Sequence, residues 1–268
     1  MGEILKLEHL NKRFEDLTVL DDIDLTVNKG EVVVIVGPSG CGKSTLLRCI
    51  NGLEDIQDGK VILDGQVINP ASKSEVKYRE KIGMVFQSYD LFPHKTILEN
   101  VILAPLKVQK RKRDEVIKEA MELLDKVGLA SRKDSFPRQL SGGQKQRVAI
   151  VRALIIHPEV LLFDEVTAAL DPEMVREVLD VILDLASQNR TMLIVTHEMA
   201  FARAIADRVI FLDGGQIVED STPEVFFDSP RTERAAKFLK TFEDDKKTRH
   251  TYFSREATME SRLTGLDI

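Results

Sequence analysis

Short apolar runs rich in valine, isoleucine and leucine alternate with helix-like patterns along most of the chain. Runs typical of buried strands occur at residues 31–36, 82–86, 160–163, 191–196 and 209–212. Apolar residues at helical spacing follow residue 43 and recur over Pro172–Ser187, where Pro172 suits a first helical position, and over residues 198–206. Strands that alternate with helices build a parallel sheet covered on both faces. The pattern therefore predicts an α/β fold with a mainly parallel core sheet.

Two regions depart from this alternation. Near the start, Asp64-Gly65 is a strong hairpin signal, and partly alternating strands are expected at residues 5–7, 20–27, 60–63 and 66–68. These strands predict a separate antiparallel β subdomain. From about residue 91 to residue 156 the pattern is helical, which predicts an inserted α-helical subdomain. The basic run at residues 110–113 is typical of a solvated helix start rather than of a lipid or nucleic-acid patch.

Composition narrows the class of protein. The chain has 268 residues and a formal net charge of −6, so no overall basic field indicates a nucleic-acid partner. No apolar stretch approaches the roughly 18 residues of a membrane span, and the first residues lack the basic and apolar regions of a signal peptide. Cys41 and Cys49 make neither a disulfide framework nor a metal site, which is typical of reduced thiols in cytoplasm.

The composition changes after residue 242. A charge cluster, Glu243-Asp244-Asp245-Lys246-Lys247, begins a stretch in which apolar residues are sparse. We therefore expect a folded domain over residues 1–242 and a C-terminal extension over residues 243–268 that is disordered or a marginal helix.

A phosphate-binding motif lies between a predicted strand and a predicted helix. Residues 37–44 read Gly-Pro-Ser-Gly-Cys-Gly-Lys-Ser and match the pattern G-x-x-x-x-G-K-S/T. The glycines let backbone N–H groups curl around phosphate oxygens, and the helix start adds partial positive charge. We expect Lys43 to reach the β- and γ-phosphates of a nucleotide and Ser44 to ligate Mg²⁺. The residues expected to hold the phosphates are Gly37, Pro38, Ser39, Gly40, Cys41, Gly42, Lys43, Ser44 and Thr45.

The same motif gives an expectation for Cys41. Its thiol lies close to a helix N-terminus and to Lys43, both of which favour a thiolate. We therefore expect Cys41 to be reactive toward alkylating reagents and Mg-ATP to protect it.

Two further features complete a nucleotide-hydrolysing site. Asp164 ends an apolar strand and is expected to hold Mg²⁺, while Glu165 is placed to accept a proton from an attacking water. Ser141 precedes Gly142-Gly143-Gln144 and a helical run, so Ser141 can cap that helix and the glycines can expose a second anion site. Taken alone, each feature has a structural alternative: an acidic pair at the edge of the core, and an ordinary capped helix.

Together the phosphate loop, Asp164-Glu165 and the Leu140–Gln144 sequence resemble the ATP-binding-cassette (ABC) ATPases, over about residues 5–242. The resemblance implies that Gln87 contacts Mg²⁺ and the water and that His197 binds the γ-phosphate. It also implies nucleotide contacts for Phe14, which would stack on adenine, and for Ser141, Gly142, Gly143, Gln144 and Asp171. A core aromatic remains the alternative for Phe14. Val166 departs from the family, which usually has proline there, so Glu165 is expected to position water more loosely.

The resemblance extends to a subfamily. Residues 86–94, 98–101 and 229–234 resemble the polar amino-acid importers of the histidine and glutamine type. It implies an ATP-hydrolysing subunit, peripheral at the cytoplasmic face of the membrane, that forms a head-to-tail dimer with a second copy of itself. Separate membrane permease subunits and, indirectly, an extracytoplasmic solute-binding protein would be its partners. We expect the permease to dock near Tyr89, Leu91 and Phe92, although their apolar side chains could equally be local core.

Two other functions stay open at this point. A cytosolic ABC-type scaffold would not take part in transport; such relatives often carry long coiled coils, zinc modules or tandem cassettes, which this sequence lacks. Export rather than import is disfavoured by the residues that resemble the importers. The sequence does not identify the solute.

Overall fold

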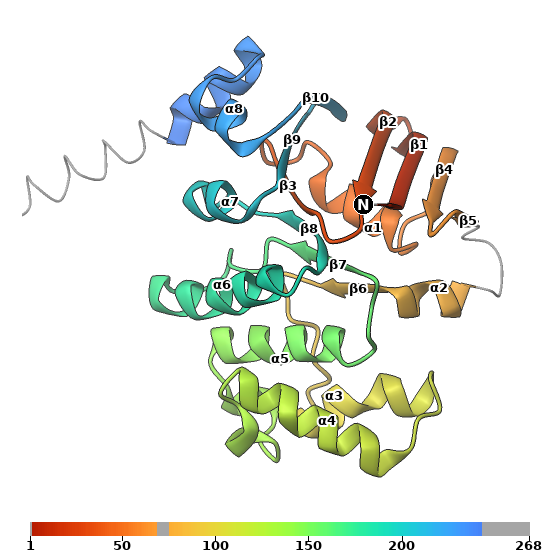
Figure 1. The fold of residues 1–268 in the computed structure, drawn as a ribbon, viewed down its shortest axis with the longest axis vertical. Helices are drawn as coiled ribbons and strands as arrows, with labels where there is room; N and C mark the ends of the chain where they lie inside the picture. Colours follow the sequence, from red (N-terminus) through yellow and green to blue (C-terminus); the bar gives the residue numbers. More distant parts are fainter. Residues whose placement is uncertain (1, 69–74, 243–268) are drawn as a thin grey trace, which may run out of the picture.

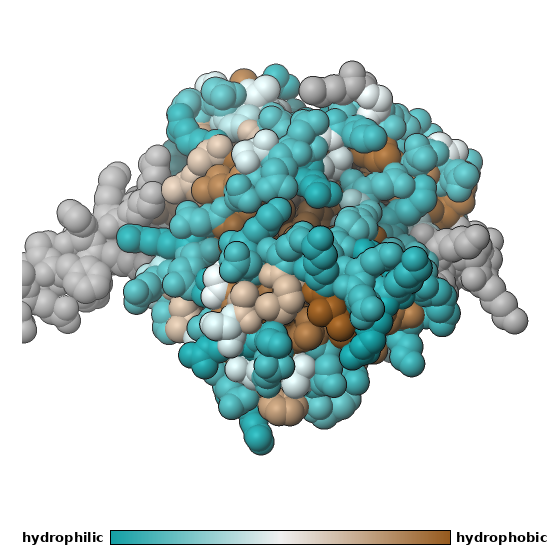
Figure 2. Space-filling view, turned by 60° about the horizontal axis from the view of Figure 1, so that its bottom comes forward, coloured by the Kyte–Doolittle hydropathy of each residue, from teal (hydrophilic) through white to brown (hydrophobic). Residues whose placement is uncertain are grey.

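The computed structural model describes residues 2–68 and 75–242 (Figure 1). The extension predicted over residues 243–268 lies outside the described residues. Within them, no helix is both long enough and apolar enough to span a membrane. On the face shown in Figure 2, hydrophilic residues cover most of the surface and apolar residues gather in small areas.

The core is a six-stranded sheet in the order β10-β9-β3-β8-β7-β6. Five strands are parallel, and β10 pairs antiparallel with β9. The strands are β3 (Val32–Val36), β6 (Ile82–Val85), β7 (Val160–Asp164), β8 (Thr191–Val195), β9 (Arg208–Asp213) and β10 (Gln216–Ser221). The predicted mainly parallel sheet is therefore confirmed.

Alternating residues of these strands enter two different apolar layers. Val33 and Ile35 of β3 pack with α1 (Lys43–Ile50) and with the N-terminal strands. Val32, Val34 and Val36 pack on the opposite face. That face is covered by α5 (Gly142–Leu154), α6 (Pro172–Ser187), α7 (Met199–Ile205), α8 (Pro223–Asp228) and a last helix over residues 233–242. Because the strands are apolar on both sides, the sequence shows continuous apolar runs rather than alternation.

The predicted antiparallel sheet is also present, at the upper right of Figure 1. Its order is β2-β1-β4-β5, formed by β1 (Glu3–Phe14), β2 (Leu17–Asn28), β4 (Asp58–Leu63) and β5 (Gln66–Ile68). The Asp64-Gly65 hairpin has left-handed backbone at both residues, with φ of 50° and 71°. The first two strands are longer than predicted, because register shifts let β1 bend while it stays paired with β2.

A group of helices at the bottom of Figure 1 has an apolar cluster of its own. It contains α3 (Ile97–Lys107), α4 (Arg113–Lys126), two short 3₁₀ helices, Ala130–Arg132 and Pro137–Gln139, and one side of α5. Helix α5 contributes Val148 and Val151 to this cluster and Ala149 and Ile150 to the layer on the core sheet. It therefore joins the helical region to the core.

Three helices were not predicted: α2 (Glu75–Lys81), α8 and the helix over residues 233–242. The first two are short, with seven and six residues, so a period of 3.6 has little room to appear. Helix α8 does carry start signals, since Thr222 caps it and Pro223 follows.

Candidate functional site

The phosphate loop leaves the C-terminal end of β3 and enters α1. Its glycines take backbone conformations that other residues avoid, with φ of 78° at Gly40 and 104° at Gly42. Two of these glycines also have no room for a side chain. A Cβ at Gly37 would lie 2.0 Å from the carbonyl oxygen of Leu212, and a Cβ at Gly42 would lie 2.9 Å from the carbonyl oxygen of Val19. The loop thus has the closely packed, left-handed turns of a phosphate cradle.

Lys43 lies inside this loop and is only 4% exposed. Its ammonium donates to the carbonyls of Gly37 at 3.0 Å and Pro38 at 2.8 Å. A buried lysine must be paired or hydrogen-bonded, and here the two carbonyls meet that need. The positive charge is therefore held at the centre of the loop.

Ser44, Asp164 and Gln87 line one cleft of about 570 Å³. The Ser44 hydroxyl donates to Oδ1 of Asp164 at 2.6 Å, although 120 residues separate them in the sequence. Burial raises the pKa of the Asp164 carboxyl, and the hydrogen bond from Ser44 and the charge of Arg48 oppose that rise. Two oxygen donors and a neighbouring amide around open space form a suitable ligand set for Mg²⁺.

Glu165 is the next residue, and its side chain contacts His197. Nε2 of His197 lies 2.8 Å from Oε1 of Glu165. The backbone of Glu165 is left-handed, with φ of 46°, and is held by a hydrogen bond from its N–H to the Val195 carbonyl at 3.0 Å. Its carbonyl accepts from Ala168 at 3.1 Å. Val166, in place of a proline, is 5% exposed and packs in the core.

The Ser141 turn lies at the start of α5 and has a full capping box. The Ser141 hydroxyl accepts from the Gln144 N–H at 3.2 Å, and the Gln144 side chain accepts from the Ser141 N–H at 3.0 Å. A Cβ at Gly143 would lie 2.9 Å from Met174, so this glycine also admits α6. None of residues 141–144 lines the cleft that contains Ser44 and Asp164.

Two other predicted nucleotide contacts occupy exposed positions. Phe14 ends β1 with 43% of its surface exposed, so its ring is not part of the core. The ammonium of Lys12 lies 4.4 Å from the ring centroid. Asp171 is the N-cap residue of α6 but makes no capping hydrogen bond with its side chain, which leaves the carboxylate available.

The chain also matches known proteins. Residues 20–168 match the family model described as ABC transporter, and the chain is 54% identical over 236 residues to the glutamate transport ATP-binding protein GluA of Corynebacterium efficiens. This match covers 88% of the chain and 98% of that relative. The chain belongs to the ABC transporter family.

Other ABC proteins match over similar lengths. The chain is 52% identical to the glutamate/aspartate import ATP-binding protein GltL of Escherichia coli, over 88% of the chain and 98% of that relative. A dimeric ATP-binding cassette, solved in a post-hydrolysis state bound to ADP and phosphate, has a TM-score of 0.74 and 35% identity. The match covers 82% of this chain and 99% of the chain in that structure. The predicted ABC-ATPase fold is therefore confirmed.

One expectation for this ABC loop is wrong. Cys41 is 6% exposed, and burial raises the pKa of its thiol rather than lowering it. The nearby charge of Lys43 opposes this rise but does not overcome it. The sequence showed the charge and the helix start, but it could not show how deeply the thiol packs beneath the loop.

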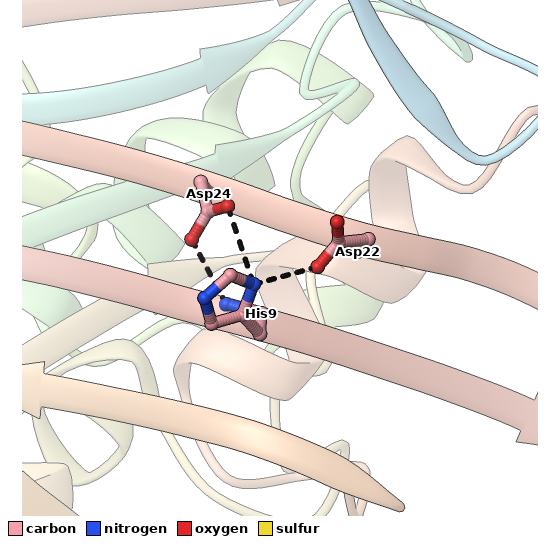
Figure 3. Close-up of side chains that lie close together, drawn as sticks. All are labelled: His9, Asp22 and Asp24. Carbon is pink, nitrogen blue, oxygen red and sulfur yellow. Dashed lines mark hydrogen bonds and ion pairs between the residues drawn. The ribbon is translucent and has the colours of Figure 1, made fainter.

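A separate cluster lies on the ABC cassette's β1 and β2 and was not predicted (Figure 3). Nδ1 of His9 lies 2.8 Å from Oδ1 of Asp22 and 3.6 Å from Oδ2 of Asp24. In the described part of the chain, this is the one group of three histidine, cysteine or acidic side chains whose ligand atoms all lie within 4.8 Å of one another, and all three residues are exposed. The hydrogen bond that the His9 ring donates to Asp22 and the charge of Asp24 raise the pKa of His9. None of the three lines the cleft with Ser44.

The sequence also missed several polar residues around the cleft of this ABC cassette. Arg48 lines it one helical turn after Ser44, a spacing that places both on one helix face. Gln146 and Arg152 of α5 bind backbone carbonyls of the segment that carries Gln87. A buried glutamine in an apolar helical run was a usable signal, but its partner was not visible in the sequence.

Proposed function

We propose that this chain is the ATP-hydrolysing subunit of a membrane importer for polar amino acids. One observation carries the catalytic part. Two successive carboxylates at the end of β7 contact two different partners, Asp164 with Ser44 of the phosphate loop and Glu165 with His197. One carboxylate is thus directed toward metal binding and the other toward proton transfer.

The phosphate loop would bind the nucleotide. We infer that Lys43 exchanges the carbonyls of Gly37 and Pro38 for phosphate oxygens, because a flexible lysine can turn toward a stronger charge partner. Gly37 and Gly42 let the backbone N–H groups approach the phosphates where a Cβ has no room.

Ser44, Asp164 and Gln87 would hold Mg²⁺ in the cleft that they share. When bound, Mg²⁺ supplies charge neutralisation for the phosphate oxygens. Asp164 must be ionised to act as a ligand, and the charge of Arg48 favours its ionised form.

Glu165 would act as the general base that takes a proton from water. The contact with His197 holds the Glu165 carboxylate in one place. The two backbone hydrogen bonds at Glu165 fix the backbone from which this side chain extends. His197 would then stabilise the transferred phosphoryl group as its charge develops.

The adenine would stack on Phe14, whose ring is partly exposed at the end of β1. Phe14→Ala should weaken ATP binding by roughly 1–3 kcal/mol, the usual value for base–aromatic stacking, and Phe14→Tyr should be nearly neutral. Isothermal titration with ATP measures both. Leu17→Ala is the matched control, because Leu17 pairs with Phe14 across the hairpin and is 67% exposed. A drop in melting temperature with unchanged ATP affinity would assign Phe14 a structural role.

We propose that the working form is a head-to-tail dimer of residues 1–242, in which the helical subdomain over about residues 91–156 presents the Ser141 turn to the partner's phosphate loop. Relatives described as ATP-binding proteins for glutamate, glutamine and L-cystine transport favour an amino acid as the solute. Membrane permease subunits would dock near Tyr89, Leu91 and Phe92; Phe92 is 41% exposed. A solute-binding protein would act through the permease.

Co-purification tests the transport role. The full chain, expressed with a tag together with membrane permease subunits of an importer for polar amino acids, should be recovered from detergent-solubilised membranes in complex with permease. Phe92→Asp should reduce that recovery, because a charge would enter an apolar contact. A chain that hydrolyses ATP but never associates with membrane subunits would favour the cytosolic scaffold instead.

A further inference from the structure

Three side chains with metal-binding atoms meet on the exposed face of the β1–β2 pair (Figure 3). Asp22 and Asp24 are exposed while Ile23 between them is buried, so both carboxylates lie on one face of β2. His9 reaches them from β1, with Nδ1 2.8 Å from Oδ1 of Asp22 and 3.6 Å from Oδ2 of Asp24. One imidazole nitrogen and two carboxylate oxygens are therefore gathered at one place.

The backbone beneath these side chains is held by hydrogen bonds of its own. The His9 N–H donates to Oδ1 of Asp24 at 2.9 Å. The Asp22 N–H donates to the Asn11 side chain at 3.1 Å, and the Asn11 amide donates to the His9 carbonyl at 2.8 Å. These bonds fix the strands where the register of β1 against β2 shifts, between residues 7 and 12. A ligand that binds all three side chains thus has little backbone to order.

The donor atoms match a divalent transition-metal ion. Imidazole nitrogen is a common ligand of zinc, copper, iron and nickel, whereas magnesium and calcium are held by oxygen atoms. Zn²⁺ binds histidine nitrogen and carboxylate oxygen at roughly 2.0–2.2 Å, so ligand atoms in a tetrahedral site lie about 3.3–3.5 Å apart. The two distances from Nδ1 of His9, 2.8 and 3.6 Å, lie on either side of that spacing. Small rotations of the side chains would therefore admit the ion.

The cluster is open to solvent and has no competing fixed cation. The exposed fractions of the side chains are 74% for His9, 63% for Asp22 and 58% for Asp24. Among the residues that the structure describes, no lysine or arginine forms an ion pair with either carboxylate. An ion bound here would keep water in its remaining coordination positions, unlike an ion in a closed structural site with four protein ligands. It would therefore exchange with the solvent.

We propose that His9, Asp22 and Asp24 form an exchangeable Zn²⁺ site on the antiparallel sheet. The site goes beyond the proposed function, because none of its residues lines the cleft in which Ser44 and Asp164 would hold Mg²⁺. Bound Zn²⁺ would link β1 to β2 where their pairing is irregular. Because the three ligands come together only in the folded sheet, binding should also stabilise the chain against unfolding.

Isothermal titration of the full, nucleotide-free chain with Zn²⁺ in excess Mg²⁺ tests the site. Mg²⁺ fills oxygen-only sites and competes poorly for imidazole. Loss of an outer-shell partner alone lowers metal affinity roughly 10–100-fold, so His9→Asn should weaken Zn²⁺ binding at least about 10-fold. Asp22→Asn should also weaken it, since the amide removes the charge and asparagine tolerates the left-handed φ of 54° at this position.

His157→Asn is the matched control. His157 is also exposed, but its Nε2 lies 3.0 Å from a single carboxylate, that of Glu119, so its removal should leave Zn²⁺ affinity unchanged. Zn²⁺ should raise the melting temperature of the wild type and not that of His9→Asn. If His9→Asn does not fold, Asp22→Asn carries the same comparison. Equal Zn²⁺ affinity in the wild type and both β1–β2 variants, or an equal loss in His157→Asn, would overturn the site. ATP hydrolysis by the wild type tests the proposed function separately.

Discussion

Glu165→Gln should bind ATP normally and lose at least about 10²-fold in turnover, since a general base contributes roughly 10²–10⁴-fold. Glutamine has nearly the same shape, so it can keep the contact between residue 165 and Nε2 of His197, which measures 2.8 Å in the structure. It cannot accept a proton from water at neutral pH. The change therefore separates proton transfer from binding and from the local fold.

Single-turnover hydrolysis and equilibrium binding of ATP measure the two quantities separately. Glu224→Gln is a suitable control, because it removes the same charge from an exposed residue in the first turn of α8. We expect the control to retain wild-type turnover. Equal hydrolysis by wild type and Glu165→Gln would remove Glu165 from the role of base.

The elements of the core were predictable because their signals are local. Val32–Val36 is apolar on both sides and stands before a glycine-rich loop, so strand, loop and helix follow from a short stretch of sequence. Pro172–Ser187 was predicted with the bounds that the structure has, since a helical pattern follows a proline at its first position. The length of β1 was not predictable, because its second half stays paired through register shifts.

The candidate site was predictable as a set of residues but not as a set of contacts. Lys43 and Asp164 stand in recognisable motifs, whereas the hydrogen bond from Ser44 to Asp164 depends on where β7 lies relative to α1. Burial is likewise a property of the whole fold, which is why the pKa of Cys41 was predicted in the wrong direction. Arg152 was missed for the same reason, since its acceptors lie about 60 residues away in the sequence.

The purified Glu165→Gln chain should be monomeric without nucleotide and dimeric with ATP, as light scattering would measure. In the proposed dimer, Lys43 and His197 of one subunit and the Ser141 turn of the other subunit contact the same γ-phosphate. ADP should not replace ATP, because it lacks the phosphate that bridges the subunits. Ser141→Arg, added to Glu165→Gln, should abolish the ATP-induced dimer by placing a large side chain where the phosphate must approach.

The Ser141→Arg result needs one further control, because Ser141 also has a structural role in α5. The Ser141 hydroxyl caps α5, so Ser141→Arg also removes a cap, at a cost of about 1 kcal/mol in the free energy of unfolding. Thr96 caps α3 with the same capping box, formed with Glu99. Thr96→Arg in the Glu165→Gln chain should therefore lose similar stability and still dimerise with ATP. The two variants differ in whether the altered turn faces a nucleotide, so loss of the dimer in both would attribute the effect to the missing cap. A dimer that survives Ser141→Arg, or a mass that does not change with ATP, would show that the isolated chain has no shared site.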